Sequence, residues 1–150
     1  EMAVVPVEPA RNAVLSTGEA GDDDYQGMGP GFVSDLLETD LLDAVETVLL
    51  EDAEDECRRL AREEGILVGQ SSGAASVAAT RVAERIAEPE LDCPEVPDDW
   101  SEMTSEGDGE NDAPQASSDG GVEQGYDDCP LVVTVFPDSG ERYLSTGLFD

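Results

Sequence analysis

The chain contains no histidine and no lysine at any of its 150 positions, and it has only seven basic residues against 37 acidic ones. These absences exclude three catalytic arrangements within the chain: a Ser-His-Asp triad, a metal site built on histidine, and a lysine Schiff base. The net charge of −30 also argues against binding to nucleic acids or anionic membrane surfaces, because almost nothing here could neutralise phosphate groups. We therefore expect no nucleic acid, no membrane and no metal.

Long hydrophobic runs and a recognisable secretory signal are missing as well. No run reaches the roughly 18 apolar residues of a transmembrane helix, so we expect a cytoplasmic protein. The three cysteines, Cys57, Cys93 and Cys129, show no CxxC spacing. Their odd number favours free thiols in a reducing compartment, and the alternative is a disulfide between Cys93 and Cys129.

The excess of acid indicates a solvent rich in salt. At about 1 M salt the Debye length is about 3 Å, so carboxylates hardly repel one another at longer range. A chain that is rich in aspartate and glutamate and free of lysine fits a halophilic cytoplasm, and we expect it to lose structure at low salt. The alternative is an ordinary acidic protein with an acidic tail.

Residues 88–130 differ in composition from the rest of the chain. They contain fifteen acidic residues and no basic one, with Pro, Gly and Ser filling much of the remainder. Such a stretch cannot bury enough apolar area to offset its ordering entropy, so we predict a disordered acidic insertion. The alternative is an acidic docking arm with Trp100 and Met103 as anchors. Residues 1–87 and 131–150 are predicted to form parts of one domain.

The ordered flanks alternate between strand and helix patterns. We expect strands at residues 2–7, within 41–50, at 66–68 and at 131–136, and helices at residues 51–65 and 71–87. The apolar run "LVVTVF" at 131–136 is typical of a strand buried on both faces. In the second helix we expect an inward-facing stripe of Ala74, Val77, Ala78, Val82 and Ile86. This alternation predicts an α/β fold with a parallel sheet.

The uncharged stretch "GQSSGA", residues 69–74, stands between a predicted strand and a predicted helix. Ligands often bind where a strand of a parallel sheet ends and a helix begins. The helix N-terminus offers unpaired N–H groups to a phosphate, whereas a serine hydroxyl suits a neutral acceptor atom. A plain helix cap at Ser71 or Ser72 explains the pattern equally well, and neither GxGxxG nor the Walker pattern is present.

Three stretches together carry a family resemblance: "DYQGMGPGFVSDLLETDLLDAV", "RRLAREEGILVGQSSGAA" and "VFPDSGERYLST". In this order they resemble the C-terminal part of cysteine synthase (O-acetylserine sulfhydrylase), a fold-type II pyridoxal-phosphate enzyme. The resemblance implies a parallel-sheet three-layer domain of the tryptophan synthase β-like architecture. It also implies a pyridoxal 5'-phosphate cofactor and replacement of the acetoxy group of O-acetylserine by sulfide, giving cysteine and acetate.

The resemblance also assigns roles at the cofactor. Ser71 is expected to face the pyridine nitrogen of the cofactor, where a hydroxyl at a helix N-terminus favours the unprotonated ring. The resemblance places three further residues near the ring end of the cofactor: Pro137, Asp138 and Ser139. It implies structural roles for Arg142 and Tyr143, as ties between this turn and the core.

The stretch "QGMGPGF" resembles the glycine-rich loop at the mouth of the family's active site. Gly27 and Gly29 would let the backbone approach the substrate, and Phe32 would line the entrance. Pro30 stands where the family usually has alanine. The acidic "GDDDYQG" also departs from the family, which tends to have basic residues there, and the insertion at 88–130 replaces a short loop.

The family's Schiff-base lysine has no counterpart here, because the chain has no lysine. The resemblance therefore implies a fragment of a longer enzyme, inactive by itself and without catalytic residues of its own. Alternatives are a cystathionine β-synthase-like enzyme, a non-catalytic half-domain that binds a partner, and a relic without function. The family also suggests a homodimer and a complex with serine acetyltransferase, for which Gln26 and Phe32 are the residues to test.

Overall fold

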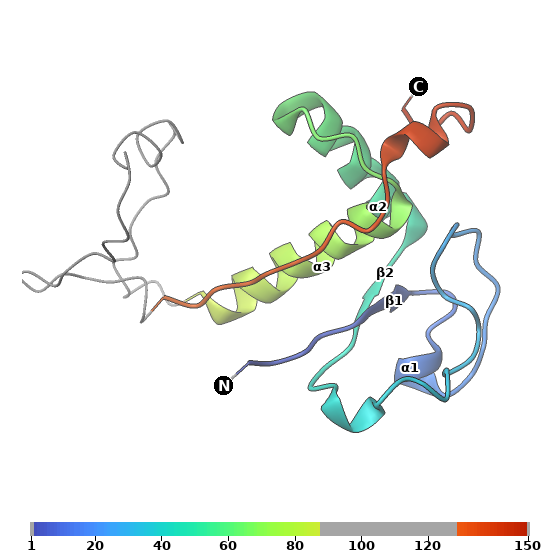
Figure 1. Ribbon diagram of the computed structural model, residues 1–150, viewed down its shortest axis with the longest axis vertical. Helices are drawn as coiled ribbons and strands as arrows, with labels where there is room; N and C mark the ends of the chain where they lie inside the picture. Colours follow the sequence, from blue (N-terminus) through green and yellow to red (C-terminus); the bar gives the residue numbers. More distant parts are fainter. Residues whose placement is uncertain (1, 88–128, 150) are drawn as a thin grey trace, which may run out of the picture. The chain divides into compact units, whose positions relative to one another are not determined.

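The computed structural model describes residues 2–87 and 129–149. Residues 1–86 and 132–150 form one compact unit, and residues 87–131 form another. The first unit carries all the helices and strands of the described residues (Figure 1). The predicted insertion, including Trp100 and Met103, lies almost entirely outside the described residues, so its disorder stays a prediction.

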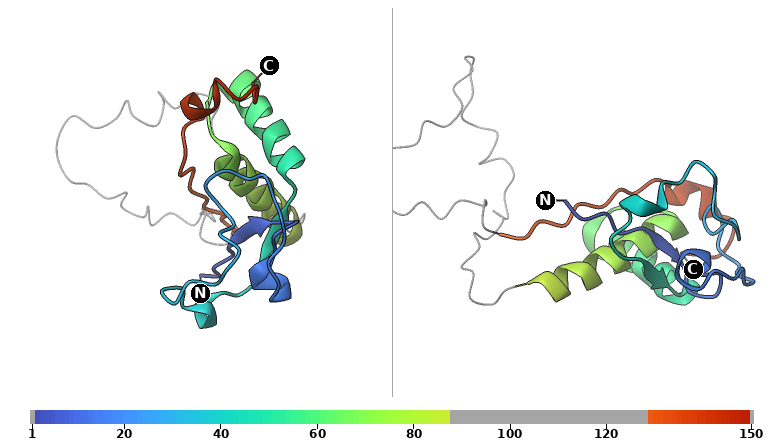
Figure 2. Two further views of the ribbon diagram at one scale, coloured as in Figure 1. Left: turned by 90° about the vertical axis from the view of Figure 1, so that its right-hand side faces the viewer. Right: turned by 90° about the horizontal axis from the view of Figure 1, so that it is seen from below.

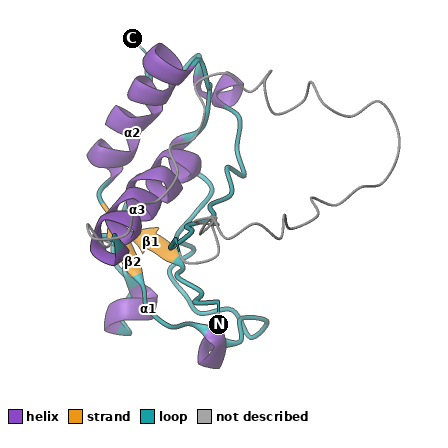
Figure 3. Ribbon diagram, turned by 90° about the vertical axis from the view of Figure 1, so that its left-hand side faces the viewer, coloured by secondary structure: helices purple, strands orange, loops and turns teal. Residues whose placement is uncertain are grey.

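The first unit is an α/β arrangement of short strands and two longer helices (Figure 3). Its elements, in chain order, are β1 (Val7–Pro9), α1 (Val14–Thr17), the 3-10 turn η1 (Thr39–Leu41), β2 (Glu46–Val48), α2 (Leu50–Arg59), the π-helical turn η2 (Leu60–Glu64), α3 (Gln70–Ile86) and the 3-10 turn η4 (Gly140–Tyr143). The predicted α/β class is confirmed by this order and by the parallel pairing of β1 with β2.

The sheet consists of two strands among the described residues. β1 and β2 pair in parallel, with Val7 opposite Glu46 and Pro9 opposite Val48. The strand predicted at residues 2–7 is therefore displaced, since the paired register starts at Val7, although the carbonyl oxygens of Val4 and Pro6 already accept from the N–H groups of Asp43 and Glu46. The strand predicted within 41–50 is confirmed as the shorter β2.

Helix α2 continues into η2 and ends where the sequence predicts, at Gly65. Acidic residues lie in the first turn of α2 and arginines in its last turn, which complements the helix dipole. Gly65 adopts the left-handed conformation, with φ of 69°, and its N–H bonds back to the carbonyl oxygen of Leu60. The helical spacing of this stretch predicts a buried face of Ala53, Cys57, Leu60 and Ala61; the first three are buried, whereas Ala61 is only partly buried.

Helix α3 packs closely on α2 through small side chains. Ala74 and Ala78 are buried against Ala53 and Val48, whereas Ile86 is exposed, so the predicted inward stripe is wrong at its far end. A methyl group added at Gly73 would stand 2.2 Å from the carbonyl oxygen of Ala53. Glycine is therefore required for the close approach of the two helices. Figure 2 shows the helices from two further directions.

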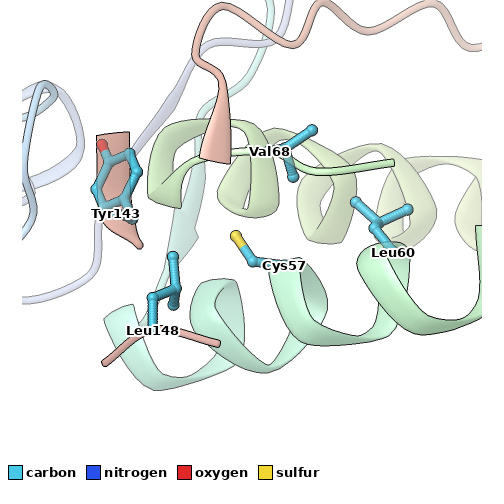
Figure 4. Close-up of a cluster of buried hydrophobic side chains, with 5 residues drawn as sticks. All are labelled: Cys57, Leu60, Val68, Tyr143 and Leu148. Carbon is cyan, nitrogen blue, oxygen red and sulfur yellow. The ribbon is translucent and has the colours of Figure 1, made fainter. Parts of the chain in front are cut away.

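A second cluster of buried side chains joins α2 to the C-terminal turn, η4. Figure 4 shows its members: Cys57, Leu60, Val68, Tyr143 and Leu148. The Cys57 thiol donates to the carbonyl oxygen of Gly69 at 3.2 Å and is free of any disulfide. Cys129 is disulfide-bonded, so the expectation of free thiols is wrong for that residue. Cys93 lies outside the described residues.

Two predicted strands do not form among the described residues. Residues 66–68 contribute only an isolated antiparallel bridge, between Val68 and Ser139. Residues 131–136 are not a strand, and Val133 and Val135 are 80% and 73% exposed, rather than buried on both faces. The described residues offer this stretch no strand partner, and an apolar run becomes a buried strand only when neighbouring strands and helices cover it.

The few basic residues are almost all used in ion pairs. Six of the seven arginines lie within 4 Å of a carboxylate, and Arg59 alone reaches Glu56, Glu63 and Glu64. Exposed pairs of this kind contribute at most about 1 kcal/mol each. Most carboxylates of the described residues therefore have no cationic partner, because the chain has so few arginines.

Candidate functional site

A pocket of about 330 Å³ lies in the first unit, beside the N-terminal end of α3. Its volume falls within the range of small-molecule sites, about 300–1,000 Å³. Four separate segments line it: β1, the glycine-rich loop, the first turns of α3, and the stretch leading into η4. The lining residues are Val7, Gly27, Met28, Ser71, Ala75, Val135, Pro137, Asp138 and Arg142.

Ser71 lies in the first turn of α3, on the pocket wall, and is half-buried. No hydrogen bond joins its side chain to another described residue. The helix begins at Gln70, and the N–H groups of Ser72 and Gly73 bond to the carbonyl oxygen of Gly69. The predicted serine cap is therefore wrong, since both serines already lie inside the helix. The Ser71 hydroxyl remains available to a ligand.

Ser72 has a different environment from its neighbour. It is fully buried, and its hydroxyl lies 3.1 Å from the carbonyl oxygen and 3.2 Å from the amide nitrogen of Asp138. The hydroxyl can donate to the first group and accept from the second. Ser72 therefore joins α3 to the segment that precedes η4 and carries the lining residue Asp138.

Asp138 is held at the pocket by its backbone and by its carboxylate. Besides the contacts with Ser72, its carbonyl oxygen accepts a hydrogen bond from the Gly69 N–H at 3.1 Å. Its carboxylate accepts from the Tyr143 hydroxyl at 2.6 Å and from the Arg142 guanidinium at 3.3 Å. A methyl group at Gly69 would stand 2.4 Å from the Tyr143 ring, so this crossing also requires glycine.

Tyr143, the last residue of η4, is buried, and its hydroxyl reaches the glycine-rich loop. Besides its bond to Asp138, its hydroxyl lies 3.4 Å from the carbonyl oxygen of Gln26. Burial, reinforced by the Asp138 carboxylate, raises the pKa of the Tyr143 phenol to about 12. The hydroxyl is therefore protonated, and it donates, at neutral pH. The expected structural role of Tyr143 agrees with these contacts, whereas Arg142 is largely exposed at the pocket wall.

The glycine-rich loop is held by two amide side chains that the sequence reasoning did not single out. The Gln26 N–H donates to the Gln70 side-chain oxygen at 3.0 Å, and the Gln70 amide donates to Glu54 at 2.8 Å. Asn12 donates to the carbonyl oxygen of Gly29 at 2.8 Å. Gln70 and Asn12 are both buried. Gln70 is the one amide side chain in "GQSSGA", and the sequence offers no further signal for its role.

The predicted site residues separate into two groups. Ser71, Gly27, Pro137 and Asp138 come together on the pocket wall, although they are up to 111 positions apart in the chain. The other three do not line the pocket: Ser139 bonds to the Glu141 N–H at the start of η4, Gly29 packs on Pro9 and Asn12, and Phe32 is 64% exposed. The roles of all these residues toward a ligand stay predictions.

The pocket wall combines a free hydroxyl with apolar side chains. The Ser71 hydroxyl can donate to a ring nitrogen, and the α3 N-terminus disfavours a positive charge on that nitrogen. Val7, Met28 and Val135 supply apolar surface to the pocket wall. Among the described residues no group of side chains is arranged to hold a metal ion, and no helix combines the length and apolarity needed to span a membrane.

Known proteins resemble this chain in sequence and in structure. No protein-family model matches the chain. A cysteine synthase of Staphylococcus aureus is 35% identical over 146 residues, which are 97% of this chain and 34% of that protein. The chain thus spans about a third of the length of the curated relatives it matches.

Solved structures give the same result. The cysteine synthase of Entamoeba histolytica matches with a TM-score of 0.67 and 27% identity, over 98% of this chain and 32% of that one. An O-acetylserine-dependent cystathionine β-synthase from Helicobacter pylori matches with a TM-score of 0.53 and 38% identity, over 58% of this chain and 28% of that one. Sequence and fold together place the chain in the cysteine synthase family of fold-type II pyridoxal-phosphate enzymes, as a part of about one third of their length.

Proposed function

We propose that the chain forms the ring-binding part of a pyridoxal-phosphate-dependent enzyme that replaces the acetoxy group of O-acetylserine by sulfide. One observation carries the proposal: the Ser71 hydroxyl stands at the N-terminus of α3, on a pocket wall, without a partner among the described residues. When bound, the cofactor would supply an electron sink for the bond-breaking steps at the amino acid.

The residues of this chain have distinct tasks in that proposal. Ser71 binds the pyridine nitrogen and keeps it unprotonated, because a hydroxyl donates a hydrogen bond without giving up its proton. Ser72 and Tyr143 hold Asp138 and Pro137 at the ring edge. Gly27 lets the backbone of the loop approach the amino-acid substrate. The amine that anchors the cofactor has to come from polypeptide outside these 150 residues, since no lysine is present.

A cystathionine β-synthase-like reaction is the second candidate. The match to the Helicobacter pylori enzyme favours it, because that enzyme has 38% identity over the part it shares with this chain. Both reactions replace a group on the β-carbon of a serine derivative, and the described pocket does not distinguish sulfide from a larger thiol. Steady-state assays of the complete enzyme with sulfide and with homocysteine would separate the two reactions.

Three further features belong to the same proposal. The first is a homodimer. The second is docking of a serine acetyltransferase tail beside the glycine-rich loop, which the exposed Phe32 supports. The third is a halophilic cytoplasm, which the scarcity of cationic partners for the carboxylates supports. Far-UV circular dichroism across a KCl series tests the last point, and a chain that stays folded in dilute buffer contradicts it.

Binding of a ring that needs no lysine tests the core of the proposal. The probe is 4'-deoxypyridoxine 5'-phosphate, which has the pyridine ring and the phosphate but no aldehyde. We expect the chain to bind this probe in concentrated KCl, with the nitrogen-15 shift of the labelled ring reporting an unprotonated nitrogen. Ser71→Ala should weaken binding about 2- to 13-fold, the equivalent of one hydrogen bond of about 0.5–1.5 kcal/mol.

A matched variant at the same site sharpens the result. Ser71→Asp places a carboxylate at the nitrogen, so the bound ring should become protonated and its nitrogen-15 shift should move accordingly. If the chain does not bind the probe, or if both variants bind it as the unaltered chain does, the assignment of Ser71 is wrong.

A further inference from the structure

Two residues of the glycine-rich loop, Gly27 and Met28, line the pocket. No backbone hydrogen bond joins either of them to another described residue. The residues on either side of them are held, because the Gln26 N–H and the Gly29 carbonyl oxygen each bond to a buried amide side chain. The backbone that faces the pocket is therefore positioned by the hydrogen bonds at its two ends.

Gln70 is the main anchor at the Gln26 end. The Gln26 carbonyl oxygen has the Tyr143 hydroxyl as a neighbour, but at 3.4 Å. That hydroxyl has one proton and lies closer, at 2.6 Å, to the Asp138 carboxylate, which accepts it. The bond from the Gln26 N–H to the Gln70 side-chain oxygen, at 3.0 Å, has the ordinary length of an N–H···O bond. The position of Gln26 therefore depends chiefly on Gln70.

Glu54 fixes which end of the Gln70 amide faces the loop. A carboxylate only accepts hydrogen bonds, and the Gln70 amide nitrogen donates to Glu54 at 2.8 Å. The amide oxygen is then left for the Gln26 N–H, which can only donate. Gln70 is 5% exposed, so water cannot readily replace either partner. One orientation of the amide alone satisfies both neighbours.

We propose that Gln70 is a positioning residue for the pocket, and that Glu54, which does not line the pocket, acts on it by orienting the Gln70 amide. The first turn of α3 then sets two parts of the pocket wall. Gln70 positions the loop, whereas Ser72 holds Asp138, and Ser71 between them offers its hydroxyl to the ligand. The effect on a ligand rests on the proposed function, and the effect on the loop does not.

Two variants of Glu54 reverse or preserve the orientation of the amide. Glu54→Lys replaces the carboxylate by an ammonium group that only donates, so the Gln70 oxygen should turn toward it and leave the Gln26 N–H. Glu54→Gln keeps an oxygen that accepts, so it should preserve the bond. Glu84→Lys is the charge control, because it makes the same change in net charge at an exposed residue of α3 without a hydrogen bond to another described residue.

The Gln26 amide reports the orientation without any ligand. In concentrated KCl, we expect a scalar coupling across the hydrogen bond, between the Gln26 amide nitrogen and the Gln70 side-chain carbonyl carbon. Glu54→Gln and Glu84→Lys should retain this coupling. In Glu54→Lys it should vanish, the Gln26 amide should exchange about five- to tenfold faster, and the Met28 methyl resonance should shift.

Binding of 4'-deoxypyridoxine 5'-phosphate separates positioning from a merely structural role. Gln70→Met, which keeps the length of the side chain without its amide, and Glu54→Lys should each weaken binding about fivefold. The double variant should bind as Gln70→Met does, because Glu54 acts through Gln70. Glu54→Gln should retain most of the affinity, and Glu84→Lys all of it.

Ser76 supplies the matched structural control. It is buried in α3, and its hydroxyl donates to Glu56 of α2 at 2.7 Å, so it joins the same two helices without touching the loop. Ser76→Ala should lower the urea midpoint and leave binding of the probe unchanged. Should Gln70→Met fail to fold, the Glu54 variants decide by themselves, because Glu54 is only partly buried.

The possible outcomes are distinct. The inference is overturned by a coupling that persists in Glu54→Lys, by equal effects of Glu54→Lys and Glu84→Lys, or by additive losses in the double variant. A loss of binding in Ser76→Ala as large as that in Gln70→Met also overturns it. If the unaltered chain does not bind the probe, the proposed function fails, and the coupling and the Met28 resonance still decide whether Gln70 and Glu54 position the loop.

Discussion

Replacing Ser72 by alanine should destabilise the fold, whereas the same change at Ser71 should not. Ser72 is fully buried, and its hydroxyl contacts both the amide nitrogen and the carbonyl oxygen of Asp138. The Asp138 carbonyl keeps a second partner in the Gly69 N–H, so losing that hydroxyl bond costs about 1 kcal/mol. The Asp138 N–H would lose its hydrogen bond to the Ser72 hydroxyl, which costs about 1–2 kcal/mol more.

The sum predicts that Ser72→Ala lowers the free energy of unfolding by about 2–3 kcal/mol. Ser71→Ala removes no hydrogen bond among the described residues, so its effect should stay within about 0.5 kcal/mol. Urea unfolding in concentrated KCl, followed by far-UV circular dichroism, measures both values under the same conditions. If both variants lower the free energy of unfolding equally, or if Ser71→Ala lowers it more, two assignments are refuted. These are that Ser72 joins α3 to Asp138 and that the Ser71 hydroxyl is left free for a ligand.

Three further predictions concern the helices and the buried titratable groups. Gly73→Ala should lower the free energy of unfolding by about 1–3 kcal/mol, because its methyl group would collide with Ala53 and Cys57; an unchanged or higher urea midpoint contradicts this. Tyr143 has its pKa raised to about 12, so its share of the stability is complete below the unfolded pKa of about 10 and is lost as pH rises from 10 to 12. Between pH 10 and 12, the free energy of unfolding should therefore fall more steeply with pH for the unaltered chain than for Tyr143→Phe. Parallel curves for the two proteins contradict the hydrogen bond between Tyr143 and Asp138. Burial raises the pKa of the Cys57 thiol to about 11, so Ellman's reagent should modify it only as fast as the chain unfolds; rapid modification of the folded chain contradicts its burial.

The helices could be predicted from the sequence because their signals are local. Gly65 ends the first helix through its left-handed backbone, and the small residues of "GQSSGAA" allow the second helix to pack closely. The parallel pairing of β1 and β2 followed from the alternation of strand and helix patterns. Boundaries were less accurate, since the paired register of β1 starts only at Val7.

The strand predicted at 131–136 shows the limit of local reasoning. Its composition specifies burial on both faces, but burial depends on neighbours that the described residues do not provide. In the pocket, Ser71 and Asp138 were found through the family resemblance, whereas Gln70 and Asn12 were missed. A buried amide that fixes a distant loop leaves no periodic or charge pattern in the sequence, so only the folded chain reveals it.

The contact between Ser72 and Asp138 has a consequence for how lineages of this protein can vary in length. It joins positions that are 66 residues apart in the chain. The entropy cost of joining the ends of such a segment grows only with the logarithm of its length, by about 0.6 kcal/mol for each doubling. Changes of length between the end of α3 at Ile86 and the lining residue Val135 should therefore cost the pocket little.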